Sequence, residues 1–149
     1  MTTDRASENE ATGKALRPSL EYTGGHCKLV LEQPGARVIV VRISGSDMGE
    51  FGEAPMLALD GWLAESGNIE LFIDARKVRG ASIDVSAEWA KWLDRNRTNL
   101  RTITMLTGSH FVHLTAEFVR RFSGLQGIMR ICTEPAVFDN ALAETLKFR

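Results

Sequence analysis

Short apolar runs alternate with longer amphipathic segments along most of this chain. Aliphatic and β-branched runs bounded by turn residues predict strands, and apolar residues that recur every three or four positions predict helices. By these patterns we expect strands over residues 27–33, 37–43, 71–74, 100–106 and 127–132. Helices are expected over residues 54–65, from about 82 to 94, over 110–122 and from about 135 onward.

This order of elements predicts an α/β fold. Pro34 and Gly35 form a turn signal between the first two strands, which should therefore pair as an antiparallel hairpin. The later strands alternate with helices, as in a mainly parallel sheet. We expect a five-stranded mixed sheet covered by about four helices, with the segment 71–74, an apolar run that ends in Asp74, buried on both faces. Residues 1–20 show no period and are expected to be a flexible tail, which leaves 21–149 as a single domain.

Helical spacing also selects the side chains expected in the core. Trp89 shares a helix face with Val85 and Leu93, whereas Trp92 is offset toward the edge of that face. We therefore expect Trp89→Ala to cost about 3–5 kcal/mol of stability, as for other large buried aromatics. The other side chains expected to face inward are Met56, Leu59, Trp62 and Leu63, then Phe111, Leu114, Phe118 and Phe122, then Phe138, Leu142 and Leu146.

Composition and charge exclude several classes of protein. The chain has 149 residues, of which 44% are hydrophobic and 25% charged, ordinary values for a globular domain. A net charge of −1 argues against a dedicated nucleic-acid binder, which is usually clearly basic. No stretch approaches the roughly 18 apolar residues of a membrane span, and the N-terminus lacks the apolar segment of a signal peptide. These features predict a cytoplasmic protein that is not transmembrane.

The chemistry-bearing residues form no catalytic or metal-binding signature. The sequence has no GxSxG, P-loop, GxGxxG or HExxH motif, so we predict no enzyme activity and no cofactor. His110 and His113 share a helix face but lack further ligands at the spacing of a zinc site. Cys27 and Cys132 have no CxxC spacing and are interpreted as two reduced thiols; a disulfide requires that their strands be neighbours.

Three segments carry a resemblance to a known family: Leu71-Phe72-Ile73-Asp74-Ala75 with the tryptophan-containing helix after it, residues 101–108, and residues 130–136. Together they resemble the STAS/SpoIIAA-like superfamily, which includes anti-sigma-factor antagonists and stand-alone bacterial domains. The resemblance implies docking onto a protein partner such as an anti-sigma-type kinase or a sensor, or, for the stand-alone branch, binding of a lipid-like ligand. It also implies a phosphorylated serine, for which Ser82 is the nearest match, although Ser82 lacks the Asp before it and the Gly after it that the family motif carries.

A candidate site follows from the ends of strands and helices. The carboxyl ends of parallel strands and the amino ends of the following helices meet at one edge of a sheet. Asp74 ends an expected strand, residues 76–79 form an expected basic loop, and Ser82 and Ser109 stand where helices should begin. Each serine either caps its helix or joins an anion-binding site, and Asp74 either caps a loop N–H or presents its carboxylate to a ligand. The complete candidate set is Asp74, Arg76, Lys77, Arg79, Ser82, Asp84, Ser109 and His110.

Charge is distributed unevenly along the chain. All charged residues over 46–70 are acidic, and basic residues outnumber acidic ones over 76–101. Opposite patches on one surface suit a protein partner or head-to-tail self-association, for instance a homodimer, whereas the alternative is two ordinary solvated faces. We therefore expect a non-enzymatic regulatory module that docks onto a protein, with a binder of a small lipid-like or anionic ligand as the alternative. A continuous core favours the first function, and an apolar cavity near Ser82 or Ser109 favours the second.

Overall fold

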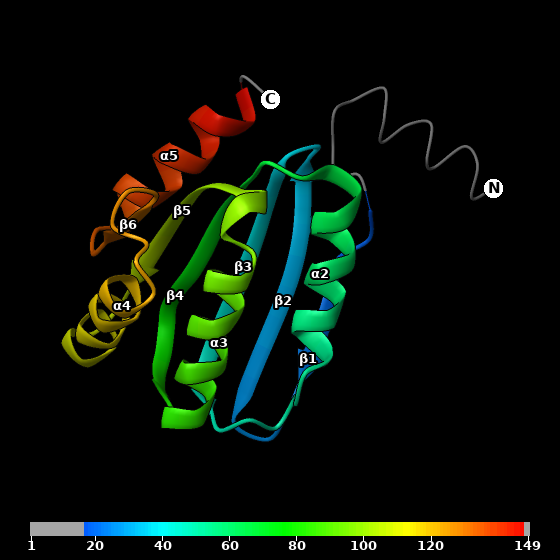
Figure 1. The fold of residues 1–149 in the computed structure, drawn as a ribbon. Helices are drawn as coiled ribbons and strands as arrows, with labels where there is room; N and C mark the ends of the chain where they lie inside the picture. The colour runs from blue at the N-terminus through cyan, green and yellow to red at the C-terminus, as the bar shows by residue number, and fades with distance from the viewer. Residues whose placement is uncertain (1–16, 148–149) are drawn as a thin grey trace.

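The computed structural model describes residues 17–147 as a layered α/β fold (Figure 1). Its strands are β1 (Leu20–Thr23), β2 (Cys27–Gly35), β3 (Val38–Asp47), β4 (Ile69–Ala81), β5 (Leu100–Thr107) and β6 (Met129–Cys132). Its helices are α2 (Ala54–Ser66), α3 (Ile83–Arg95), α4 (His110–Phe122) and α5 (Pro135–Lys147), with a short 3₁₀ turn, η1, at Arg97–Asn99.

The strands form one mixed sheet in the order β1-β2-β3-β4-β5-β6. The first three strands pair antiparallel, and β3 to β6 pair parallel, so the predicted opening hairpin and the interior position of β4 are confirmed. The sheet has six strands in the described part of the chain, and the prediction of five was wrong. The strand missed is β1, whose four residues are too few for an apolar-polar alternation to stand out. The predicted tail 1–20 lies outside the described residues up to position 16, and its last residue, Leu20, already belongs to β1.

Strand β4 is longer than its apolar run. It continues to Ala81, so the basic segment 76–79, predicted to be a loop, is part of a strand. The cause is β3, which offers a long parallel neighbour: Ser44 aligns with Lys77 past one irregularity in register, and Asp47 aligns with Ala81 past a second. Lys77 is exposed and Val78 is partly buried, a period of two that belongs to strands.

The helices form a layer on each face of the sheet (Figure 1). Side chains of α2, α3 and α4 pack with alternate strand residues such as Leu29, Ile39 and Leu71 in the larger core. Phe138 of α5 packs with the intervening residues, among them Phe72, in a smaller core on the opposite face. Because β4 lies between two packed layers, both of its faces are buried over its first half.

The inward faces of α3 and α4 differ from those predicted. Trp92 is fully buried and Trp89 only partly, because the axis of α3 is turned so that Trp92 and Leu93 point to the sheet. The indole N–H of Trp92 donates to Asp60 Oδ1 of α2 at 2.8 Å, a hydrogen bond that holds α3 in this rotation. In α4, the buried residues are Val112, Ala116 and Val119, and the four bulky residues predicted to be core are exposed.

The two cysteines are free and buried. Cys27 lies in β2 and Cys132 in β6, with three strands between them, or about 19 Å at the usual strand spacing of about 4.8 Å. The interpretation as two reduced thiols is therefore confirmed. Among residues 17–147 no helix is long and apolar enough to cross a membrane.

Candidate functional site

Asp74 is the centre of a chain of ion pairs on the α5 face of the sheet. Its buried carboxylate accepts from Arg42 Nη1 of β3 at 2.8 Å, from Arg76 Nε at 3.0 Å and from the Arg76 backbone N–H at 3.2 Å. Arg76 in turn donates from Nη2 to Asp139 Oδ1 of α5 at 2.6 Å. The two carboxylates, with Asp139 contributing first, raise the pKa of Arg76 above its ordinary value. These ion pairs link β3, β4 and α5. The oxygens of the Asp74 carboxylate are therefore already hydrogen-bonded within the chain.

The two remaining basic residues of the set, Lys77 and Arg79, are exposed on β4. Neither forms an ion pair with any residue that the structure describes. Lys77 borders a hollow of about 520 Å³ between α5 and the open part of the sheet, together with Lys28, Ser44 and Asp74. The basic segment therefore lies on the α5 face of the sheet, and it does not surround the amino end of a helix as an anion-binding loop would.

Ser82 caps α3. Its hydroxyl accepts from the Val85 backbone N–H at 3.1 Å, and its own N–H donates to the Asp47 carbonyl at 3.0 Å. Ser82 also borders a hollow of about 440 Å³ between α2 and α3, which is lined by the carboxylates of Asp47, Glu53, Asp84 and Glu88 and by no described Lys or Arg. The surroundings of Ser82 are acidic, so they do not add to the attraction that a helix amino end has for an anion.

Ser109 caps α4 in the same way. Its hydroxyl accepts from the Val112 backbone N–H at 3.2 Å, and His110, the next residue, is exposed. The turn before it passes so close to β4 that a Cβ on Gly108 would lie 2.0 Å from the Arg76 carbonyl oxygen. The described residues contain no group of three or more His, Cys, Asp or Glu that could hold a metal ion.

The candidate residues therefore fall into two groups. Ser109 and His110 lie beside Asp74 and Arg76, but Ser82 lies at the far end of β4, about 26 Å from Asp74 at about 3.3 Å per residue. The expectation of one convergent edge assumed that β4 ends at Asp74. Because β4 continues to Ala81 while β5 ends opposite Ala75, the amino ends of α3 and α4 are staggered along the sheet.

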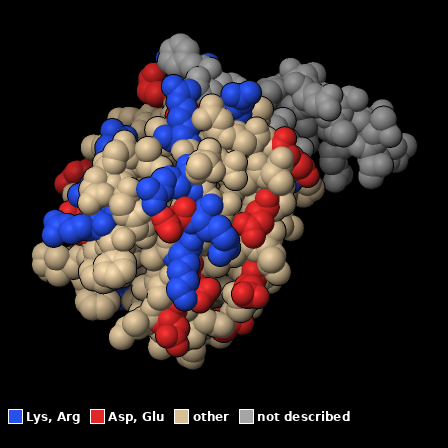
Figure 2. All heavy atoms as spheres, viewed as in Figure 1, with Lys and Arg blue, Asp and Glu red and all other residues tan. Residues whose placement is uncertain are grey.

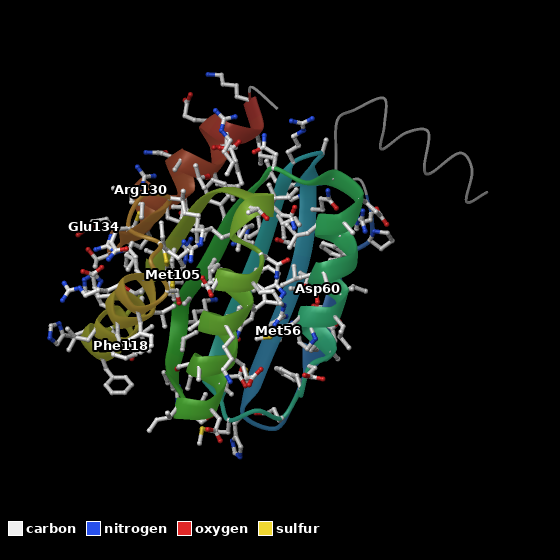
Figure 3. All side chains as sticks on the ribbon, viewed as in Figure 1. Met56, Asp60, Met105, Phe118, Arg130 and Glu134 are labelled. Atoms are coloured by element: carbon white, nitrogen blue, oxygen red, sulfur yellow. The ribbon has the colours of Figure 1, made fainter. Side chains whose placement is uncertain are left out.

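A surface that sequence reasoning missed lies on α4. Phe111, Leu114, Phe118 and Phe122 form a stripe along the whole helix, with 64%, 55%, 64% and 78% of their surface exposed. The rings of Phe118 and Phe122 stack on each other with centroids 5.1 Å apart. Figure 3 shows Phe118 pointing away from the sheet. The sequence did contain a signal for this surface, because Val112, Ala116 and Val119 supply a second apolar face at helical spacing, and a helix with two apolar faces can bury only one against the sheet.

A groove of about 830 Å³ runs beside the stripe, between α3 and α4. The α4 wall carries the bulky stripe, and the α3 wall carries small residues together with the exposed Ile83 at its amino end. Beneath it, between the helices and the sheet, is a smaller hollow of about 100 Å³ with mostly apolar lining that includes Val85, Val112 and Met129. We call the stripe and this groove together the α3–α4 face.

Opposite charges lie side by side on the helical layer. Figure 2 shows Asp and Glu over α2, and Lys and Arg interspersed with Asp and Glu over α3. The basic side chains of α3 include the exposed Lys91 and Arg95, and the acidic ones of α2 include Asp60 and Glu65. Of the two arrangements left open by the sequence, helices on opposite faces or side by side, the structure has the second.

Comparison with known proteins gives structural matches. No protein-family model matches the sequence, and no curated protein matches it either. Among solved structures, the anti-sigma factor antagonist SpoIIAA in its unphosphorylated form has a TM-score of 0.50 and 16% identity, over 77% of this chain and 96% of that chain. An uncharacterised DUF3478-family protein with a SpoIIAA-like fold from Shewanella loihica PV-4 has a TM-score of 0.59 and 14% identity, over 81% and 98% of the two chains. At these identities the likeness concerns the fold, and the chain therefore has the SpoIIAA-like fold that its pattern of strands and helices predicted.

Proposed function

We propose that this chain is a non-enzymatic regulatory module that docks onto a protein partner through its α3–α4 face. The observation that carries the proposal is the stripe of four bulky apolar side chains on α4, each more than half exposed. Aromatic side chains are enriched in protein interfaces, and contiguous apolar patches on a monomer mark interaction sites. The likeness in fold to an anti-sigma factor antagonist supports a partner such as an anti-sigma-type kinase or a sensor.

Part of the predicted site belongs to this proposed surface. Ser82 and Asp84 flank Ile83, which lines the groove, and Ser109 and His110 immediately precede Phe111 of the stripe. We propose that a partner touches these four residues at the amino ends of α3 and α4. Asp74 and Arg76 are proposed to serve the structure of the opposite face, because internal ion pairs satisfy both, and the exposed Lys77 and Arg79 are proposed to lie outside the docking surface.

Regulation by phosphorylation of Ser82 remains a prediction. The acidic side chains around Ser82 oppose the addition of a dianionic phosphate, and the hydroxyl is already used as a helix cap. For this reason we propose docking through apolar surface as the main mode of action, and a phosphate on Ser82 as a secondary control. We also propose a bacterial cytoplasmic location for the module, because two buried free thiols suit a reducing compartment.

Site-specific photocrosslinking tests the proposed function. A photoreactive residue at position 118 should give one discrete adduct with a partner protein in cells, whereas the same residue at position 57 should give none. Leu57 is the matched control, because it lies on α2 with the same 64% exposure as Phe118. The adduct should then be reproduced with purified proteins, with binding lost in Phe118→Asp and kept in Leu57→Asp. Equal crosslinking from both positions would contradict a docking role for the α3–α4 face.

A small apolar ligand is the second candidate function. The hollow beneath the groove supports it, since an apolar cavity near Ser82 or Ser109 is the feature that a lipid-like ligand requires. Its volume of about 100 Å³ is nevertheless smaller than the roughly 150 Å³ of a cavity that admits benzene. Of this hollow and the groove above it, the groove alone reaches the size of ordinary ligand pockets, about 300–1,000 Å³, and it is open to solvent, which is why a protein surface ranks first.

Native mass spectrometry with palmitate tests this alternative. A bound fatty acid should add its mass to the protein and should be lost in Ala90→Phe, which places a ring in the groove that Ala90 lines. Absence of any adduct in the wild-type protein, under conditions that keep it folded, would exclude a fatty acid as the ligand.

A further inference from the structure

The α3–α4 face exposes more apolar surface than a monomer usually leaves open. Its five bulky residues, the four of the stripe and Ile83, are between 55% and 87% exposed. If each presents about 200 Å² when fully exposed, together they expose on the order of 700 Å². The largest apolar patch of an ordinary monomer is roughly 300–600 Å², and each partner in a standard interface buries about 800 Å². The face by itself therefore approaches the area that a stable dimer needs.

We propose that a second copy of this chain covers the α3–α4 face, in a symmetric dimer formed by antiparallel packing of the two α4 helices. This inference rests on the proposed function, in which the α3–α4 face is a docking surface, and it identifies a second copy of the chain as the molecule that docks there. A dimer of this kind also regulates the module, because a partner protein that uses the same face must compete with self-association.

The spacing of the stripe fits a twofold axis. Its residues follow one another at intervals of three, four and four, so the stripe runs about 16 Å along α4. In an antiparallel pair, Phe111 of one copy lies opposite Phe122 of the other, and Leu114 lies opposite Phe118. Every bulky side chain of the stripe thus meets another, and the axis passes near Ala116 and Glu117 at the middle of the helix.

The groove is complementary to the stripe. Small residues of α3 line the wall that faces the stripe, namely Ser86, Ala87 and Ala90, and Ser123 and Gly124 line the groove just after the end of α4. These positions leave room for aromatic rings that belong to another molecule. A twofold interface needs a surface that fits itself, and this face carries the projecting rings and the space for them side by side.

The charges around the groove do not select a charged partner. Arg97 is ion-paired with Asp94 and donates to the Ser123 carbonyl at 3.0 Å, and Lys91 pairs with Glu88 at 3.9 Å. Basic and acidic groups at the rim are thus already matched within the chain. A partner surface that suits the α3–α4 face is therefore also apolar at its centre and balanced in charge at its rim. The α3–α4 face of a second copy has this composition.

Sedimentation equilibrium of the full chain over a wide dilution series tests the proposal. The wild-type protein should show a reversible species of twice the 16.5 kDa chain mass. Phe118→Asp should weaken the dimer at least about a hundred-fold, because a central aromatic is lost from both halves of the interface. Leu57→Asp, at an equally exposed position on α2, should dissociate like the wild type. Phe122→Asp, at the last residue of α4, provides a second variant if Phe118→Asp does not fold by circular dichroism.

Crosslinking tests the arrangement of the two helices. Thr115→Cys, near the proposed axis, should give a covalent dimer with a short bismaleimide, whereas Leu57→Cys should not. The native Cys27 and Cys132 do not interfere, because they are only 5% and 6% exposed. A wild-type protein that is monomeric throughout the dilution series overturns the dimer. A dimer that persists in both Phe118→Asp and Phe122→Asp, or that crosslinks only from position 57, overturns the proposed arrangement. If the wild type is monomeric and position 118 still crosslinks to a different protein, the dimer is wrong and the proposed function stands; if neither occurs, both fail.

Discussion

Replacement of Trp92 by alanine should be among the most costly single changes in this chain. Trp92 is fully buried between α3 and the sheet, and its indole N–H donates to Asp60 of α2. Trp89, one turn earlier, is partly buried and lies edge-on to Trp92 with ring centroids 5.9 Å apart. The two substitutions Trp92→Ala and Trp89→Ala therefore compare a buried and a half-buried tryptophan on one helix.

The expected magnitudes follow from burial. A tryptophan that buries about 200–250 Å² contributes at most about 5–6 kcal/mol at about 25 cal/mol per Å². Measured losses for large aromatics are about 3–5 kcal/mol, and loss of the bond to Asp60 adds about 1 kcal/mol. We expect Trp92→Ala to cost about 4–6 kcal/mol and Trp89→Ala about 1–2 kcal/mol, the latter well below the loss that helical spacing alone suggested.

Urea unfolding followed by far-ultraviolet circular dichroism measures both losses, because the backbone signal does not depend on the number of tryptophans. Trp92→Phe serves as the control that keeps an aromatic ring and removes the N–H, and should cost about 1–2 kcal/mol. A Trp89→Ala variant that loses as much as Trp92→Ala would refute the rotation of α3 described above. A loss below about 2 kcal/mol for Trp92→Ala would refute its burial.

Three further predictions concern the α5 face, a close backbone approach and a buried thiol. Asp74→Asn should cost about 2–3 kcal/mol in urea unfolding, since it removes the carboxylate that two arginines share. Gly108→Ala should lower the melting temperature, because its Cβ would lie 2.0 Å from the carbonyl oxygen of Arg76; Gly61→Ala, with open space around it in α2, should raise the melting temperature or leave it unchanged. Burial, with two nearby carboxylates, raises the pKa of Cys27 from 9.0 to about 11, so the folded protein should resist thiol alkylation at pH 8. Because the folded pKa is the higher one, this thiol's contribution to stability is present below pH 9 and is lost as pH rises toward 11; the stability difference between wild type and Cys27→Ala, measured in urea, should shrink over that range.

The order of strands and helices was predictable from the sequence. The run 71–74 is apolar at every position but the last, a pattern typical of a strand covered on both faces, and β4 is such a strand. Helix capping was one of the two roles predicted for Ser82 and Ser109, because a short hydroxyl side chain can accept from a free backbone N–H of the first turn, and both serines do so. These features are local, since each depends on residues a few positions apart.

The length of β4 and the position of the candidate site depended on a distant segment. The basic residues and the glycine after Asp74 are compatible with either a loop or an exposed strand. This segment is a strand because it pairs with β3. That pairing separates Ser82 from Ser109 along the sheet. No spacing within the segment itself contains this information, because the partner strand lies about 30 residues earlier in the chain.

Which face of each helix turns inward was also decided by the tertiary structure. The sequence determined that α4 is helical and that it has apolar side chains at helical spacing, but two faces of α4 satisfy that description. The small set, Val112, Ala116 and Val119, lets the helix approach the sheet and α3 closely, and the bulky set around Phe118 does not fit in that space. Hydrophobic periodicity reports that a face avoids water, whereas the shape of the neighbouring elements determines whether it is covered by the same chain or left for another molecule.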